Sequence, residues 1–332
     1  MIKPPAALSF DLDNLWSYLK THGDRGWEAY PTYLPRLIPD VLGVMARRRL
    51  RLTFFVVGRD AERTENAAPL ASIARAGHEI GNHSFDHEPW MSIGPADKIA
   101  RDIETAEKAI VAASGVRPDG FRGPGFCWSP DLLEILADRG YRYDASTLPT
   151  FLGPLGRAYY FARSGFAAEE KALRSDLFGG WRDGLRPSGP YLWALPSGRR
   201  LAEIPVTTIP LLKTPFHLSY LLYLARFSES LMTGYLRLAM AACRAAGIGP
   251  SFLLHPLDFL GPEDAPGLAF FPGMDINRSR KLRLAGRVLD LLAERFDLVP
   301  LGEFAHSLEA GPRPLRLRPA SSGGKKPAGV GS

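Results

Sequence analysis

Apolar residues recur along this chain in two kinds of segment that alternate with each other. Short apolar runs, rich in β-branched and aromatic residues, predict buried strands at residues 6–13, 52–58, 78–82, 119–122, 141–146, 251–256 and 298–301. Longer stretches with apolar residues three and four positions apart predict helices at residues 35–49, 60–76, 95–113, 130–140, 219–246 and 277–296, with a short terminal helix after the last strand. This alternation favours parallel strands with helical crossovers, so we expect an α/β fold with one barrel or sheet.

The alternation stops between residues 148 and 206, where Gly, Pro and aromatic residues dominate. Within this stretch, Pro196-Ser197-Gly198 predicts the turn of a hairpin that runs from Tyr191 to Val206. We interpret residues 148–206 as an insertion in a single domain of residues 1–310, either a substrate wall or a structural embellishment. The polar, aromatic stretch from Trp16 to Tyr33 predicts a long loop above the end of the first strand.

The formal net charge of +6 is concentrated at the C-terminal end. Residues 311–332 hold five basic residues and no acidic one, which leaves about +1 for the rest of the chain and argues against a nucleic-acid partner. This stretch is rich in Pro, Gly and Ser, which predicts a disordered tail. The tail is either a solvated terminus or a contact for anionic lipid or another polyanion.

The low number of cysteines and the lack of a signal-peptide pattern favour a reducing, cytoplasmic location. Cys127 and Cys243 are too few for a disulfide framework, and neither belongs to a CxxC pair. The first residues show no pattern of signal-peptide type. Three prolines and several charged residues interrupt the longest apolar region, 204–227, so we expect no transmembrane helix.

Polar residues stand at the ends of four predicted strands: Asp11 and Asp13, His83 with His87, Arg122, and His255. The carboxyl ends of parallel strands lie at one face, so we expect these side chains to converge. On a helical turn, the four-residue spacing of the histidines would put both rings on one side. Two imidazoles and one carboxylate form a three-ligand site with an open position, which suits Zn²⁺ or a similar cation.

Such a site predicts hydrolysis. A second carboxylate beside the cation would accept a proton from water, and a histidine opposite would donate one to a leaving amine. Arg122 would orient that carboxylate through paired hydrogen bonds. The chain shows no GxGxxG, P-loop or GxSxG sequence, so nucleotide-binding and serine-hydrolase interpretations lack their signals.

Each of these residues also has an ordinary structural use. Aspartates cap turns, histidines fill surfaces and cores, and a buried arginine forms a structural ion pair. Trp16 and Trp128 are candidates for stacking on a sugar, with packing as the alternative. We assign structural roles to His22, His217, His306 and Cys127.

In its motifs the chain resembles the polysaccharide deacetylases of carbohydrate esterase family 4, also known as the NodB-homology family. The stretches that carry this resemblance are Ser9-Phe10-Asp11-Leu12-Asp13-Asn14, His83-Ser84 with His87, Arg122-Gly123-Pro124 and Leu254-His255-Pro256. The first stretch resembles the D-x-D variant branch rather than the usual TFDDG. Gly125 stands where an aromatic residue is common. Tyr143-Asp144-Ala145-Ser146 is nearest to the fourth motif and lacks its usual tryptophan.

The resemblance implies a deformed (β/α) barrel of about seven parallel strands, with the 148–206 region as an insertion. It implies Asp13, His83 and His87 as ligands of one divalent metal ion, with Zn²⁺ expected and Co, Ni, Fe or Mn as alternatives. It further implies Asp11 as general base, His255 as general acid, Arg122 as the brace of Asp11, and Asp144 as a residue that tunes a neighbour.

The activity implied is removal of an acetyl or formyl group from the nitrogen of an amino sugar. A cytoplasmic enzyme would meet a lipid-linked precursor at the inner membrane face more readily than an extracellular polymer. The apolar segment 209–224 would then make a peripheral membrane contact, with ordinary core as the alternative. Two other functions are an allantoinase-like hydrolase of cyclic amides, some of which lack a metal, and a non-catalytic protein that binds carbohydrate or lipid.

Overall fold

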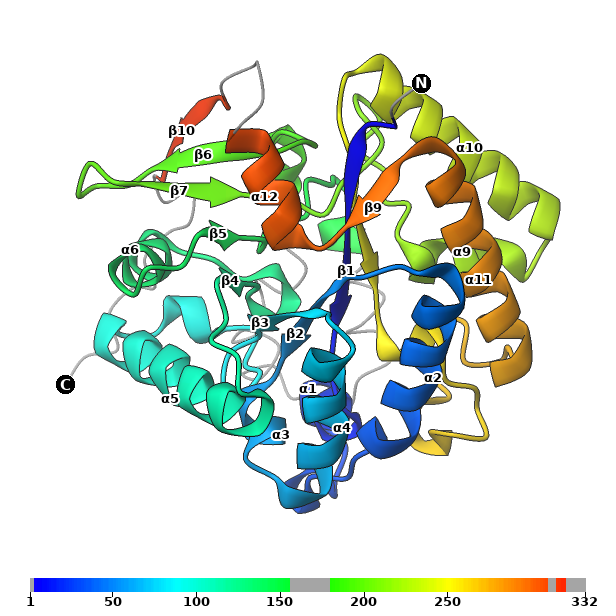
Figure 1. The fold of residues 1–332 in the computed structure, drawn as a ribbon, viewed down its shortest axis with the longest axis horizontal. Helices are drawn as coiled ribbons and strands as arrows, with labels where there is room; N and C mark the ends of the chain where they lie inside the picture. The colour runs from blue at the N-terminus through cyan, green and yellow to red at the C-terminus, as the bar shows by residue number, and fades with distance from the viewer. Residues whose placement is uncertain (1–2, 156–179, 310–314, 321–332) are drawn as a thin grey trace.

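The structure is a computed structural model that describes residues 3–155, 180–309 and 315–320 (Figure 1). Its strands are β1 (Pro5–Asp11), β2 (Thr53–Val56), β3 (Glu79–Asn82), β4 (Gly120–Phe121), β5 (Tyr143–Asp144), β6 (Tyr191–Ala194), β7 (Arg200–Glu203), β8 (Ser251–Leu254), β9 (Asp297–Val299) and β10 (Leu317–Pro319). Its α-helices are α1 (Leu15–His22), α2 (Leu34–Arg48), α3 (Gly58–Ala61), α4 (Thr64–Arg75), α5 (Ala96–Ser114), α6 (Pro130–Asp138), α9 (Leu218–Ala225), α10 (Glu229–Ala245), α11 (Arg278–Arg295) and α12 (Leu301–Glu309).

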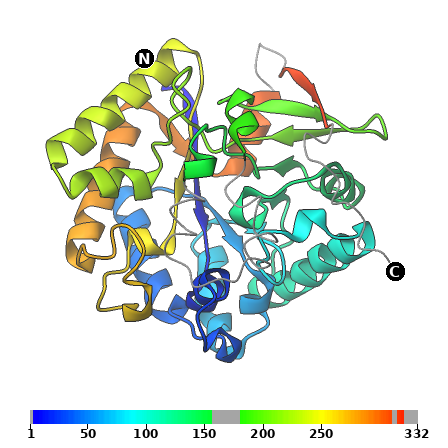
Figure 2. The same cartoon turned by 180° about the vertical axis from the view of Figure 1, so that it is seen from behind.

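The strands form one mostly parallel sheet in the order β10-β6-β7-β5-β4-β3-β2-β1-β8, and β9 also pairs with β1. Seven neighbouring strands, from β7 to β8, pair in parallel, and the β6–β7 hairpin is antiparallel. In Figures 1 and 2, helices α2, α9, α10 and α11 lie along one side of the molecule, and α5 and α6 lie along the other. The prediction of an α/β fold with about seven parallel strands and a hairpin is therefore confirmed.

The segment that follows β7 brings the two ends of the parallel sheet together. Val206 donates its backbone N–H to the carbonyl of Thr147, just beyond β5, at 2.9 Å. The next residue, Thr207, donates to the carbonyl of Ser251 in β8 at 3.0 Å. This connection makes the sheet a deformed barrel, and it directs the carboxyl ends of the strands toward one face.

Local sequence explains where several elements begin and end. The Ser129 hydroxyl accepts the N–H of Leu132 and caps α6, with Pro130 in the first helical position, as predicted. Gly115 has φ of +74° and ends α5 in the left-handed conformation that glycine adopts most readily. The turn of the hairpin falls at Pro196-Ser197-Gly198, also as predicted, with Gly198 at φ of +82°.

Three predicted elements are wrong in detail. Residues 16–33 contain helix α1 and a short 3₁₀ turn at Trp27–Ala29 instead of a continuous loop, because Asn14 caps the helix with its side chain. The predicted helices 60–76 and 219–246 are each divided in two. In the second case Ser228 interrupts the helix, since its hydroxyl accepts the N–H groups of Ser230 and Leu231 and starts α10 anew.

The predicted disordered tail is wrong for residues 317–319. They form β10, which pairs in parallel with β6, and Ala320 donates its N–H to the carbonyl of Ala194 at 3.0 Å. Strand β6 would otherwise present unpaired backbone groups at the edge of the sheet, and β10 satisfies them. The remaining predictions for the tail and for residues 156–179 of the insertion lie outside the described residues. No α-helix in the described ranges has the length and apolar character needed to cross a bilayer.

Candidate functional site

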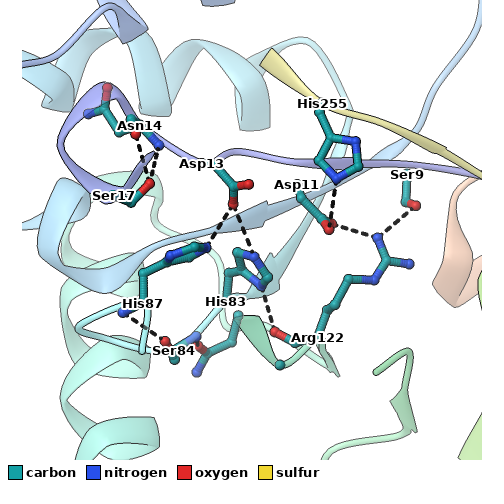
Figure 3. Close-up of polar contacts among 12 residues, drawn as sticks. Ser9, Asp11, Asp13, Asn14, Ser17, His83, Ser84, His87, Arg122 and His255 are labelled. Carbon is teal, nitrogen blue, oxygen red and sulfur yellow. Dashed lines mark hydrogen bonds and ion pairs between the residues drawn. The ribbon is translucent and has the colours of Figure 1, made fainter. Parts of the chain in front are cut away.

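Asp13, His83 and His87 meet beyond the ends of β1 and β3. The Oδ1 atom of Asp13 lies 3.2 Å from Nε2 of His83 and 2.9 Å from Nε2 of His87. All three side chains are buried, and one ligand atom from each lies within 4.8 Å of the others. Figure 3 shows Asp13 pointing toward both rings. The three residues that the motifs singled out as ligands therefore form one compact donor set.

The two histidines converge through a tight turn, so the predicted helical turn is wrong. Residues 83–87 are non-helical, and Ser84 and His87 have φ of +64° and +49°. The Asn82 side chain accepts the N–H of Ser84 at 2.9 Å, and the Ser84 hydroxyl accepts the N–H of His87 at 3.1 Å (Figure 3). The Asn82 and Ser84 side chains thus accept the backbone N–H groups that the turn leaves unpaired, and they stabilise the left-handed conformation of Ser84 and His87.

The donor chemistry of this set fits a bound cation. Nδ1 of His83 lies 2.6 Å from the Arg122 carbonyl, which can only accept, so Nδ1 carries the proton. In a neutral ring, Nε2 then directs a lone pair at the Asp13 carboxylate, and a cation between them would turn this repulsion into attraction. If the rings are instead protonated, the charges and hydrogen bonds of His87 and His83 hold the pKa of Asp13 well below its usual range, although burial alone would raise it.

Asp11, two residues before Asp13, serves a different set of partners. Its Oδ1 accepts a hydrogen bond from Nη1 of Arg122 at 2.6 Å, and that Nη1 also donates to the Ser9 hydroxyl at 3.0 Å. Nε of Arg122 donates to the Ala145 carbonyl at 2.9 Å, and the guanidinium is fully buried. Arg122 thus contacts Asp11 through one hydrogen bond, so the predicted pair of hydrogen bonds is wrong. Its role as the brace of Asp11 stays a prediction.

His255 lies on the other side of Asp11, with its Nε2 3.9 Å from Oδ2 of that carboxylate (Figure 3). Its backbone N–H donates to Asp258 at 2.8 Å, and its Nδ1 lies 3.3 Å from the hydroxyl of Ser219. Burial raises the pKa of Asp258, against the opposing charge of His255 and a hydrogen bond from Ser219. Ser219 and Asp258 therefore orient the imidazole that the motif predicts as general acid.

Sequence reasoning missed Ser9, Ser219 and Asp258, and it assigned His217 to a structural role. The His217 ring centroid lies 5.8 Å from that of His255, so His217 also borders the site. Asp258 stands three residues after His255, where a carboxylate can cap the turn that starts at that histidine. That spacing was a usable signal, whereas Ser219 becomes a neighbour only through the packing of α9 against β8.

Asp144 stands apart from these contacts. The Ser146 hydroxyl donates to it at 2.5 Å, and that hydroxyl in turn accepts the N–H of Gly123 at 2.7 Å. Burial raises the pKa of Asp144, and burial next to Asp144 raises the pKa of Glu203 well above its usual range. Asp144 thus supports the loop after Arg122, and its tuning role remains a prediction.

The two tryptophans differ in their surroundings. Trp16 is only 1% exposed, and its Nε1 donates to Asp60, so Trp16 takes the packing role that was the alternative to sugar stacking. Trp128 is half-buried, and its ring stacks on Trp193 at a centroid distance of 4.8 Å. The Arg186 guanidinium lies 4.2 Å from the centroid of the Trp128 ring. Its packing is explained without a ligand.

Comparison with known proteins agrees with this geometry. Residues 22–143 match the family model described as polysaccharide deacetylase. Over these residues, the chain is similar to the polysaccharide deacetylases. The family match includes His83, His87 and Arg122, and it does not extend to Asp11, Asp13, Asp144 or His255. Asp11, Asp13 and His255 lie outside the matched residues, and the fold brings them next to His83, His87 and Arg122.

Two curated deacetylases are similar over part of their length. The chitooligosaccharide deacetylase of Sinorhizobium fredii (strain NBRC 101917 / NGR234) is 31% identical over 131 residues, which are 37% of this chain and 60% of that protein. The peptidoglycan-N-acetylglucosamine deacetylase of Listeria monocytogenes serotype 1/2a (strain 10403S) is 29% identical over 86 residues, or 26% of this chain and 18% of that protein. Both matches span less than two thirds of the relative.

One solved structure extends the similarity to nearly the whole fold. A protein from Mycobacterium smegmatis, assigned to the polysaccharide deacetylases, superposes with a TM-score of 0.57 at 20% identity. The match covers 96% of this chain and 94% of that one. This chain therefore shares its fold with that protein well beyond residues 22–143.

Proposed function

We propose that this protein is a metal-dependent hydrolase that removes an N-acetyl group from an amino sugar. The observation that carries the proposal is the separation of two carboxylates only two residues apart. Asp13 faces the two histidines, while Asp11 faces Arg122 and His255. A donor set for a cation thus lies beside a paired base and acid, which are the groups that amide hydrolysis requires.

In this proposal, Asp13, His83 and His87 hold a divalent cation, with zinc expected. When bound, the cation supplies Lewis-acid chemistry that polarises the carbonyl of the scissile amide and makes water more acidic. Asp11 accepts a proton from the attacking water, and Arg122 keeps that carboxylate oriented. As the carbon–nitrogen bond breaks, His255 donates a proton to the leaving nitrogen, so the products are acetate and a free amine.

The substrate class follows from the chitooligosaccharide and peptidoglycan deacetylases to which the chain is similar. A lipid-linked amino sugar at the inner membrane face is a narrower form of the proposal, with formyl as the alternative acyl group. Exposed apolar residues on α9, the helix that also carries Ser219 beside His255, favour this form. The complete three-residue donor set argues against the metal-free cyclic-amide hydrolases.

The test is an Asp11→Asn variant assayed for acetate release from chitooligosaccharides, with metal content measured on the same samples. We expect turnover to fall by about 10²–10⁴-fold, the usual contribution of a general base, while the bound metal stays at the wild-type level. Asp97→Asn, at an exposed aspartate of α5, serves as the control. Wild-type protein that carries metal but releases no acetate or formate would support a non-catalytic binder instead.

A further inference from the structure

Exposed apolar side chains gather where the turn after Pro210 meets helices α9 and α10. Among the described residues, seven of the fifteen large apolar side chains that are exposed fall within residues 211–238. We refer to these seven as the apolar face: Leu211, Leu212, Tyr220, Tyr223, Phe227, Leu231 and Leu238. The hydroxyl of Tyr235 in α10 donates to the Pro215 carbonyl at 2.8 Å and ties the turn to the helices. Such a concentration of exposed apolar surface marks an interaction site.

The most exposed part of the apolar face is a hydrogen-bonded turn with two leucines. Leu211 is 93% exposed and Leu212 is 62% exposed. Leu211 has φ of +68° between Pro210 and Leu212, and the N–H of Leu212 donates to the Pro210 carbonyl at 2.9 Å. A left-handed leucine in a three-residue turn is strained and rare. Here the strained backbone holds apolar side chains in solvent, which contributes nothing to packing within the chain.

Charge distinguishes between the partners that could cover this face. Residues 211–246 contain four basic residues, Lys213, Arg226, Arg237 and Arg244, and one acidic residue, Glu229. Glu229 is paired with Arg283 at 2.7 Å, Arg226 is paired with Asp275 at 2.9 Å, and Lys213 donates to the Ser188 hydroxyl at 3.0 Å. Arg237 and Arg244, both exposed on α10, therefore leave the surroundings of the face cationic. In a symmetric dimer the same patch would meet itself and bring like charges together. An anionic lipid surface complements both the apolar side chains and the cations.

We propose that the apolar face docks on an anionic lipid bilayer. Leu211 and Leu212 enter the headgroup region, and the tyrosines of α9 lie at the level where amphipathic aromatic rings are favoured. Arg237 and Arg244 of α10 provide attraction to anionic headgroups. In Figure 1, α9 and α10 lie on the opposite side of the molecule from α5, so docking leaves the α5 side free.

The docked face borders the candidate site. Ser219, which lies 3.3 Å from Nδ1 of His255, directly precedes Tyr220 of the face. The Tyr220 ring packs 4.7 Å from His217, which borders His255. A docked molecule would therefore hold its proton donor near the lipid surface, where an amphiphilic amino sugar is presented. This last consequence rests on the proposed function, whereas the docking itself does not.

The test is co-sedimentation of the full-length protein with vesicles of phosphatidylcholine, with and without phosphatidylglycerol. We expect binding that requires phosphatidylglycerol, and we expect Leu211→Asp/Leu212→Asp to weaken it by at least about tenfold, since two exposed leucines no longer leave water. Leu211→Ser/Leu212→Ser tests the same loss without added charge. Val111→Asp/Val116→Asp, at two exposed valines around the end of α5, introduces the same charge and should bind like the wild type.

Three results would overturn the docking proposal. The first is that the wild type stays in the supernatant with both kinds of vesicle. The second is that the leucine variants bind as tightly as the wild type, which would assign binding to the basic tail. The third is that the wild type does not bind vesicles and is a dimer in solution, whereas the leucine variants are monomers. That result would assign the apolar face to contact with a second copy of the chain. Acetate release from soluble chitooligosaccharides, measured in parallel, reports on the proposed function independently, and the leucine variants should retain it.

Discussion

Arg122 connects the two halves of the candidate site. Its guanidinium donates to Asp11 at 2.6 Å, and its backbone carbonyl faces Nδ1 of His83 at 2.6 Å. The side chain is fully buried, so the ion pair with Asp11 is shielded from water. Removing one partner of a buried pair leaves the other charge uncompensated, which is strongly destabilising. The orientation of the base and of one ligand thus depends on the same residue.

Arg122→Lys should keep the charge and lose the geometry. One ammonium group cannot reach Asp11, Ser9 and the Ala145 carbonyl together, as the guanidinium does. We expect kcat to fall by about 10²-fold and the free energy of unfolding to drop by about 1–3 kcal/mol. Steady-state kinetics and urea unfolding measure the two effects. Arg48→Lys, at a surface pair with Asp290, is the control, and an unchanged kcat for Arg122→Lys would contradict the role.

Ser219→Ala should affect turnover more than substrate binding. The hydroxyl lies between Nδ1 of His255 and the Asp258 carboxylate, so its loss releases the orientation of the imidazole. We expect kcat to fall by about tenfold with KM nearly unchanged, because one neutral hydrogen bond contributes about 0.5–1.5 kcal/mol. Ser230→Ala, at an exposed serine of α10, should behave like the wild type. A rise in KM at constant kcat would instead indicate a substrate contact.

At the scale of elements, a buried network ties α1 to α3 next to the candidate metal ligands. Asp60 in α3 accepts hydrogen bonds from Nδ2 of Asn14 at 2.7 Å and from Nε1 of Trp16 at 2.8 Å. Asn14 follows Asp13 directly and caps α1. The position of Asp13 relative to β3 therefore depends on contacts between two helices as well as on β1.

This network predicts a pH dependence of stability. Burial raises the pKa of Asp60 from 3.8 to about 7. Between about pH 4 and 7, folded Asp60 keeps a proton that the unfolded chain has released. The contribution of Asp60 protonation to the free energy of unfolding is therefore fully present below about pH 4 and is lost as pH rises through about 7. Asp60→Asn should flatten the decline in free energy of unfolding across that window, measured by urea titration at several pH values. Equal slopes in variant and wild type would contradict the prediction, and Asp290→Asn is the exposed control.

At the scale of the whole molecule, the donor set joins segments that are distant in sequence. Asp13 follows β1, and His83 and His87 follow β3, with β2 between these strands in the sheet. A cation that binds only the folded arrangement stabilises it by mass action. Cation binding should therefore be visible in global unfolding as well as in catalysis.

Removing the metal should lower the melting temperature. At a free zinc concentration of about a hundred times Kd, binding contributes about 2.7 kcal/mol, which is a shift of a few degrees for a domain of this size. Calorimetry with zinc and with a chelator measures the shift. His83→Ala/His87→Ala should show the same melting temperature in both conditions. Identical melting of the wild type with and without chelator would argue against the site.

The order of residues was sufficient to predict the elements that repeat a simple period. Runs such as Thr53–Val56 and the helix spacing of Arg278–Arg295 are local properties, and both elements form where expected. Once the strands were predicted, the polar residues at their ends were apparent, and parallel strands place their carboxyl ends at one face. Breaks inside helical stretches were not predicted, because Ser228 and Asn14 act through side-chain caps that compete with the helical period.

What the residue order left open was settled by contacts between distant segments. Strand spacing does not distinguish Asp11 from Asp13, and the two carboxylates acquire different partners only when the residues after β3 and β4 bring His83 and Arg122 close to the end of β1. Ser219 reaches His255 through packing of α9, and β10 adds to β6 across more than a hundred residues. Periodicity is a property of neighbours along the chain, whereas the division of labour among polar groups depends on which surfaces the folded chain brings together.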